Sequence, residues 1–224
     1  MGESPWGFES LRPHLTTVDH VILVTPDAAV TAARLLADHG LASTPGGRHP
    51  GQGTANRIVP LGNAYLEVVH VHDRDEAAGS PFGRWVTRLA AAAEQLGAAE
   101  QLGAVCLGTN DITGVADRIG SPAVTMQRVR PDGVTLSWTV TGVDTALQAG
   151  LPFFIQWHVA PEDHPSRTPV GHLVDVHGIE WVEIGVDADA LERHVGSPSI
   201  LIRAGSHLGG VRAGIATGGG TIVL

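Results

Sequence analysis

Two side chains on predicted strands have the chemistry of metal ligands or of an acid–base pair. His20 lies in the apolar, β-branched segment 18–25 (VDHVILVT), and Glu67 lies in the segment 64–72 (AYLEVVHVH). A neutral imidazole and a carboxylate suit Zn, Ni, Fe or Mn, and a metal with open positions can polarise a substrate oxygen. The alternative for His20 is a structural histidine, hydrogen-bonded to backbone where the strand begins. The alternative for Glu67 is a buried carboxylate held by an arginine.

A loop rich in glycine and proline, 43–53 (STPGGRHPGQG), separates a predicted helix from the next strands. Its glycines allow backbone to approach a ligand closely, and Arg48 can donate two hydrogen bonds to a carboxylate or phosphate. We expect His49 in this loop and Asn56 on the following strand to contact the ligand as well. The alternative is a structural turn. No Walker or strand–GxGxxG–helix pattern is present, so no nucleotide cofactor is predicted.

A second candidate ligand-binding group lies in the middle of the chain. Arg128 belongs to the predicted strand 124–130, and Trp138 lies across a hairpin that turns at Pro131-Asp132-Gly133. Together with Trp157 they can form a binding surface for an anionic, partly flat ligand. The alternative is a solvated strand face with one buried tryptophan.

The remaining side chains of reactive type are expected to be structural. By strand alternation His70 and His72 face away from Glu67, so we expect them on the surface. Cys106 lies among apolar neighbours and is predicted to be an inert core thiol. Because it is the only cysteine, an intramolecular disulfide and a four-thiolate metal site are excluded.

The composition favours a globular protein with many strands and tight turns. The 224 residues are 43% hydrophobic and include 29 glycines. The net charge is −9 and no basic run occurs, which argues against a nucleic-acid partner. The sequence has no apolar run of the ~18 to 20 residues that cross a bilayer and no signal-peptide pattern, so we expect a cytoplasmic location and no membrane partner.

The predicted elements repeat. The segments 20–30 (HVILVTPDAAV), 104–114 (AVCLGTNDITG) and 181–191 (WVEIGVDADAL) each indicate a strand, an Asp-bearing turn and a helix. The first two are followed by strands at 54–61 and 64–72, and at 124–130, 134–141 and 151–159. We therefore predict an irregular arm at 1–16, paired βαβββ modules within 17–177 (about 17–80 and 104–160), and a third, shorter β-α-β module at 178–224.

This arrangement resembles the vicinal oxygen chelate superfamily, which includes glyoxalase I and the extradiol dioxygenases, and most closely its bacterial glyoxalase-like domain proteins. The segments that carry the resemblance are DHVILVTPDAAV at the start of the first module, 46–69 (GGRHPGQGTANRIVPLGNAYLEVV), 128–138 (RVRPDGVTLSW) and 151–158 (LPFFIQWH). The resemblance implies an α+β fold in which the curled mixed sheets of the modules form a ligand cup.

The resemblance also implies that His20 and Glu67 point into the cup and bind one divalent metal. Aligning the modules places Ala104 opposite His20, and laying AYLEVV on FFIQWH places Gln156 opposite Glu67. His158 lies on the same strand face as Gln156. A site of His20, Glu67 and His158, with Gln156 nearby, would resemble the two-His-one-carboxylate arrangement of non-haem iron. The alternative is that the cup binds its ligand without metal.

The predicted function is an enzyme, a lyase, isomerase or dioxygenase, that acts on a small oxygenated metabolite. Glu67 would serve as a ligand, and His158 as a third ligand or a base. The alternative is a non-catalytic drug- or metabolite-binding protein with the same fold. Superfamily members often close the cup by pairing modules, in some cases across a dimer, so a homodimer is compatible with the odd third module.

Overall fold

The computed structural model describes residues 16–130, 133–196, 202–205 and 210–224. The predicted arm, except Thr16, lies outside the described residues, and so do Pro131 and Asp132 of the predicted hairpin turn.

The first half of the chain has a strand, a helix and three more strands. The helix begins after Asp27, whose side chain accepts hydrogen bonds from the next backbone N–H groups, and it ends at Gly40 with a left-handed φ of 69°. These elements are β1 (Thr17–Val24), α1 (Ala28–His39), β2 (Thr44–His49), β3 (Thr54–Pro60) and β4 (Tyr65–Val71).

The second half repeats this order after two connecting helices. The first helix of the second half, Ile112–Ile119, is capped by Asp111 in the same way as α1 is capped by Asp27. This capping confirms the predicted Asp-bearing turn. The connecting helices are α2 (Arg74–Gly79) and α3 (Pro81–Gln95), and the second half consists of β5 (Gln101–Gly108), α4 (Ile112–Ile119), β6 (Val124–Val129), β7 (Thr135–Thr141), α5 (Val143–Ala149) and β8 (Phe153–Trp157). No element was predicted at α5, which lies between Gly142 and Gly150.

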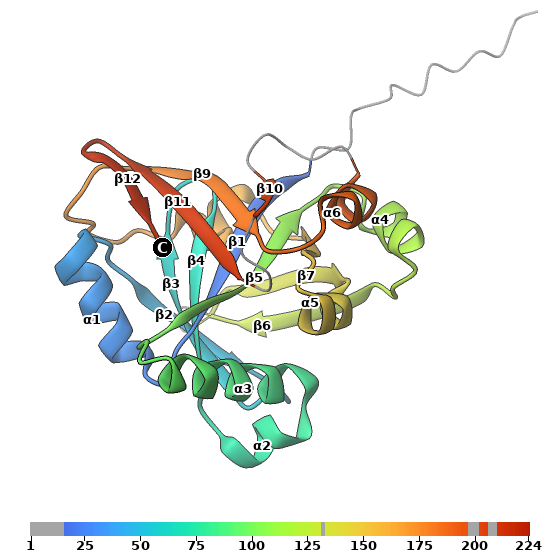
Figure 1. The fold of residues 1–224 in the computed structure, drawn as a ribbon, viewed down its shortest axis with the longest axis horizontal. Helices are drawn as coiled ribbons and strands as arrows, with labels where there is room; N and C mark the ends of the chain where they lie inside the picture. Colours follow the sequence, from blue (N-terminus) through green and yellow to red (C-terminus); the bar gives the residue numbers. More distant parts are fainter. Residues whose placement is uncertain (1–15, 131–132, 197–201, 206–209) are drawn as a thin grey trace, which may run out of the picture.

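The two halves form one eight-stranded mixed sheet with the order β2-β3-β4-β1-β5-β8-β7-β6. At its centre β1 and β5 pair antiparallel, with His20 opposite Cys106 and Ile22 opposite Ala104. The sheet curls until its outer strands approach each other, since Arg128 on β6 donates a hydrogen bond to the carbonyl of Gly46 on β2 (Figure 1). The predicted α+β fold with a curled sheet that forms a cup is confirmed.

The last part of the chain forms a second, four-stranded sheet with the order β10-β9-β11-β12. Its elements are β9 (Val176–Ile184), α6 (Ala188–Val195), β10 (Ile202–Ala204), β11 (Val211–Thr217) and β12 (Gly220–Val223). In this part β9 pairs in parallel with β10, the strand that follows α6 directly. In the first half β1 instead pairs in parallel with β4, the last strand of that half. Val182 and Ile215 of this sheet share one apolar core with Val21 and Leu66, so it backs the cup rather than lining it.

The glycine-rich segment differs from its prediction as a loop, because 44–49 is a strand. Among the described strands, β2 pairs with β3 alone and forms an edge of the sheet, so Pro45 needs no partner on its outer side. The pairing is irregular between Pro45 and Gly47, and Gly47 has a φ of 140°. This strand fixes His49 against the sheet. In the described parts of the chain no helix is long and apolar enough to cross a membrane.

Candidate active site in the cup

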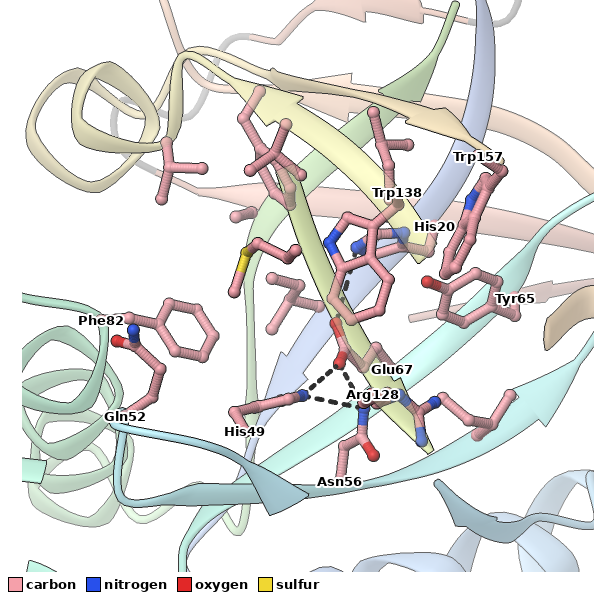
Figure 2. Close-up of a pocket in the computed structure, with 18 of the residues that line it drawn as sticks. His20, His49, Gln52, Asn56, Tyr65, Glu67, Phe82, Arg128, Trp138 and Trp157 are labelled. Carbon is pink, nitrogen blue, oxygen red and sulfur yellow. Dashed lines mark hydrogen bonds and ion pairs between the residues drawn. The ribbon is translucent and has the colours of Figure 1, made fainter. Parts of the chain in front are cut away.

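A cavity of about 200 Å³ lies inside the cup, between strands of both halves and the start of α3. One side is polar and the other is apolar (Figure 2). The polar lining includes His20, His49, Gln52, Asn56, Glu67 and Arg128, and the apolar lining includes Phe82, Trp138, Val140, Phe153, Ile155 and Trp157. The cavity therefore suits a small molecule with a polar group at one end and an apolar body.

Glu67 on β4 is the centre of the polar side. His20 Nε2 lies 3.5 Å from its Oε2, and His49 Nε2 lies 3.2 Å from its Oε1. The amide of Asn56 donates a hydrogen bond to the same Oε1 (Figure 2). Glu67 is only 8% exposed. Two imidazoles and one amide thus converge on a single buried carboxylate.

Each imidazole is held from behind through its other nitrogen. His20 Nδ1 lies 2.6 Å from Asp19 Oδ1, and His49 Nδ1 lies 2.8 Å from Thr54 Oγ1. The second oxygen of Asp19 accepts a hydrogen bond from Trp157 Nε1 at 2.9 Å. These contacts direct both Nε2 atoms toward Glu67, and such outer partners are typical of histidines that bind metals.

The carboxylates of Glu67 and Asp19 are both ionised at neutral pH. Burial alone would raise the pKa of Glu67, but the hydrogen bond from His49, the charges of His20 and His49 and the amide of Asn56 lower it to about 2. Burial opposes ionisation of Asp19 as well, and contacts with His164 and His20 lower the pKa of Asp19 to about 2. Two buried negative charges must be balanced by protons on the rings or by a cation.

The donor set fits a divalent metal. In a neutral His20 ring whose Nδ1–H donates to Asp19, the Nε2 lone pair faces Glu67, which as a carboxylate only accepts. When the Nδ1–H of His49 donates to Thr54, its Nε2 lone pair likewise faces Glu67, and the amide nitrogen of Asn56 lies 3.2 Å from the same Nε2. Lone pairs that face one another are stable only around a proton or a metal ion. Two imidazole nitrogens and a carboxylate suit Fe, Zn, Mn or Ni.

A second group could also hold a metal. Within the described residues, ligand atoms of Asp19, His20 and Cys106 lie within 4.8 Å of one another. Cys106 is fully buried, and burial together with the charges of Asp19 and Glu67 raises the pKa of its thiol well above the usual value. Neither Asp19 nor Cys106 lines the cavity, whereas His20, His49 and Glu67 all do. The set around Glu67 is therefore the better candidate.

The strand register shows what the second half contributes at the equivalent place. In the first half Ile22 pairs with Glu67, and in the second half Cys106 pairs with Phe153. At the centre His20 pairs with Cys106 and Ile22 pairs with Ala104, so the approximate two-fold relation about the Val21–Val105 pair exchanges Ile22 with Cys106. Phe153 is therefore the counterpart of Glu67. This register corrects the sequence alignment that placed Gln156 opposite Glu67.

The structure leaves three of the predicted site residues outside the cavity. Gln156 points to the outer face of the sheet, where its Oε1 accepts a hydrogen bond from Ile112 N at the start of α4. His158 Nε2 lies 2.8 Å from Thr139 Oγ1, and Arg48 is exposed. The other predicted residues line the cavity, namely His20, Glu67, His49, Asn56, Arg128, Trp138 and Trp157.

Sequence reasoning did not assign Asp19, Tyr65 or His164 to the site. Tyr65 lines the cavity and stacks on His20 with ring centroids 4.6 Å apart. His164 Nε2 lies 3.0 Å from Asp19 Oδ2. Alternation along a regular strand places Asp19 and His20 on opposite faces, but the pairing of β1 is irregular between Val18 and His20, and this irregularity lets Asp19 reach the ring.

The fold is a curled mixed sheet that encloses a cavity. Residues 18–196 match the family model described as the glyoxalase-like domain, and the chain belongs to this family. Membership confirms the resemblance to the vicinal oxygen chelate superfamily noted in the sequence. No curated protein matches the sequence.

Solved structures with a similar fold have low sequence identity to the chain. A hypothetical protein from Staphylococcus aureus is 16% identical, with a TM-score of 0.56 over 93% of this chain and 84% of that one. A variant of methylmalonyl-CoA epimerase from Streptomyces coelicolor, in complex with 2-nitronate-propionyl-CoA, is 17% identical, with a TM-score of 0.44 over 64% and 96%. The epimerase from Mycobacterium tuberculosis is 14% identical, with a TM-score of 0.46 over 69% and 95%.

Proposed function

We propose that the cup is the active site of an enzyme, a lyase, isomerase or dioxygenase, that acts on a small oxygenated compound with a divalent metal. His20, His49 and Glu67 would hold the metal, so His49 takes the place first given to His158. One observation carries the proposal: two imidazole Nε2 atoms face the two oxygens of one buried, ionised carboxylate.

A bound metal would supply a Lewis acid that polarises a substrate oxygen and stabilises negative charge on it. The residues of the chain would do the rest. Burial and nearby carboxylates raise the pKa of Tyr65 well above its usual value, so its hydroxyl keeps the proton and can donate a hydrogen bond to a substrate oxygen. Trp138 and Phe153 would exclude water and hold the apolar body of the substrate.

Elemental analysis of the purified protein, after incubation with Zn, Fe, Ni or Mn and removal of free ions, tests this ligand set. We expect about one equivalent of metal in the wild type and loss of metal in His49→Ala and Glu67→Gln. His158→Ala is the matched control, because His158 lies outside the cavity. Retention of metal in His49→Ala with loss in His158→Ala would overturn the ligand set.

The second candidate is a binding protein without catalysis. It is favoured by the counterparts of His20 and Glu67 in the second half, Ala104 and Phe153, which are both apolar and both line the cavity. A wild-type protein that binds none of the four metals, and that binds small aromatic compounds without converting them, would support this candidate over the enzyme.

A further inference from the structure

Arg128 is a cation of the cavity wall whose role the metal set does not explain. Its guanidinium lies at the gap between β6 and β2, where Nη1 donates to the carbonyl of Gly46. Gly47 makes this approach feasible, since a Cβ at Gly47 would lie 2.8 Å from Nη1. The contact positions the guanidinium beside the polar side of the cavity (Figure 2).

The remaining donors of Arg128 have no protein acceptor among the described residues. No carboxylate of the described chain lies within 4.0 Å of its guanidinium, whereas Arg34, Arg130 and Arg203 each form an ion pair. Nε and Nη2 of Arg128 make no hydrogen bond to any described residue either. Burial also lowers the pKa of Arg128, and the charge of Glu67 only partly offsets this effect. A half-buried guanidinium without an ion pair carries an energetic cost that an anionic ligand would relieve.

The charge of the cavity wall would be balanced by one negative charge on the ligand. Arg128 is a cation of the cavity wall with no carboxylate of the described residues within 4.0 Å, so its single positive charge is left to be balanced by the ligand. A monoanion restores neutrality, whereas a phosphate dianion would overshoot it.

The shape of the site narrows the class of anion. A guanidinium with Nη1 already engaged can still present Nε–H and Nη2–H side by side, which matches the two oxygens of a carboxylate. Trp138 and Trp157 lie on the adjoining strands β7 and β8 of the same wall, with ring centroids 5.4 Å apart, and offer flat apolar surfaces. A cavity of about 200 Å³ is below the ~300 Å³ at which drug-sized ligands begin to fit, so it suits a compound about the size of a single ring.

We propose that Arg128 selects substrates that carry one carboxylate attached to a small, flat, apolar group, and that it binds this carboxylate through its free edge. The inference rests on the proposed function and specifies its substrate class. Arg128 is therefore a specificity-determining residue, in addition to tying β6 to β2.

Isothermal titration with benzoate and its neutral analogue benzamide tests the proposal on metal-loaded protein. We expect wild type to bind benzoate about tenfold or more tighter than benzamide, as a charge-assisted pair of hydrogen bonds implies. Arg128→Gln should lose this preference, and Arg128→Lys should retain part of it, because lysine keeps the charge but lacks the fork. Arg48→Gln is the matched control and should behave as wild type, since Arg48 is exposed and outside the cavity.

Equal affinity of wild type for the two probes, no detectable benzoate binding, tighter binding of phenyl phosphate, or a preference that survives Arg128→Gln would each overturn the inference. Circular dichroism of each variant establishes that the cup is folded, and Arg128→Lys provides the readout if Arg128→Gln does not fold. Parallel titrations of chelator-treated wild type separate the two proposals. A protein without metal that still prefers benzoate through Arg128 contradicts the metal site alone, and a metal-loaded protein without the preference contradicts the substrate class alone.

Discussion

The Asp19 carboxylate lies 2.6 Å from Nδ1 of His20, although the two residues are neighbours on one strand. The irregular pairing of β1 makes this contact possible, and Trp157 and His164 fix the other carboxylate oxygen. Asp19 therefore holds the His20 ring in the tautomer and orientation that direct Nε2 at Glu67. An ionised partner of this kind also makes the ring a stronger metal ligand.

Asp19→Asn should weaken metal binding about 10- to 100-fold without removing a ligand. The amide is isosteric, but it lacks the charge that fixes the Nδ1–H tautomer. Competition with a chromophoric chelator measures the affinity. Asp163→Asn is the control, since Asp163 pairs with Arg130 outside this cavity. Unchanged affinity in Asp19→Asn would show that His20 is not a ligand or is oriented by other contacts.

The metal-free protein should lose stability as the pH falls from about 4.5 to about 2. The folded-state pKa values of Asp19 and Glu67 are lowered from 3.8 and 4.5 to about 2, so their contribution is complete above the unfolded pKa values and disappears as each carboxylate is protonated. Both groups are buried, and each contributes on the order of 2 to 3 kcal/mol.

Urea unfolding of chelator-treated protein across this pH range measures the effect. In Glu67→Gln the dependence on pH should be shallower, because one of the two titrating carboxylates is absent. An equally steep dependence in this variant would place the acid sensitivity at carboxylates outside the cup.

Gly46→Ala should disrupt the polar side of the cavity. A Cβ at Gly46 would lie 2.9 Å from Cγ of Asn56 and 3.0 Å from Cγ1 of Ile58, so the Asn56 amide would be forced off Glu67. Overpacking of this kind typically costs about 1 to 3 kcal/mol. We expect lower thermal stability together with weaker metal binding. Gly171→Ala, where an added Cβ meets nothing within 4 Å, should change neither, and a loss of metal in both variants would contradict this explanation.

Strand and helix signals were enough to predict β1, α1, β3 and β4 of the first half and two of the central residues. His20 and Glu67 lie on strongly apolar strands, and alternation fixes the face on which each side chain lies. His49 was predicted only as a loop contact, because Pro45 and Gly47 are typical of loops although they lie in an edge strand. The β1 irregularity that positions Asp19 leaves no mark in the residue pattern.

The role of Gln156 was misassigned for a different reason. Laying AYLEVV on FFIQWH matches apolar letters, but the register across β5 and β8 is set by pairing of Cys106 with Phe153. The sequence alone does not show which residues lie opposite each other on neighbouring strands. An alignment that is shifted by an odd number of residues assigns every side chain to the wrong face of the sheet. Gln156 therefore lies on the outer face.

This outer position leads to a last prediction: Gln156→Leu should lower stability and leave the metal content unchanged. Gln156 Oε1 accepts a hydrogen bond of 3.0 Å from Ile112 N, the first residue of α4, and leucine would leave that N–H without its acceptor at a cost of about 1 kcal/mol. Gln156→Glu keeps the acceptor and adds a negative charge at a helix N-terminus, so it should be as stable as wild type or more so. Urea unfolding and elemental analysis of the two variants check both halves of the prediction. Loss of metal in Gln156→Leu at unchanged stability would mean that Gln156 contributes to the metal site.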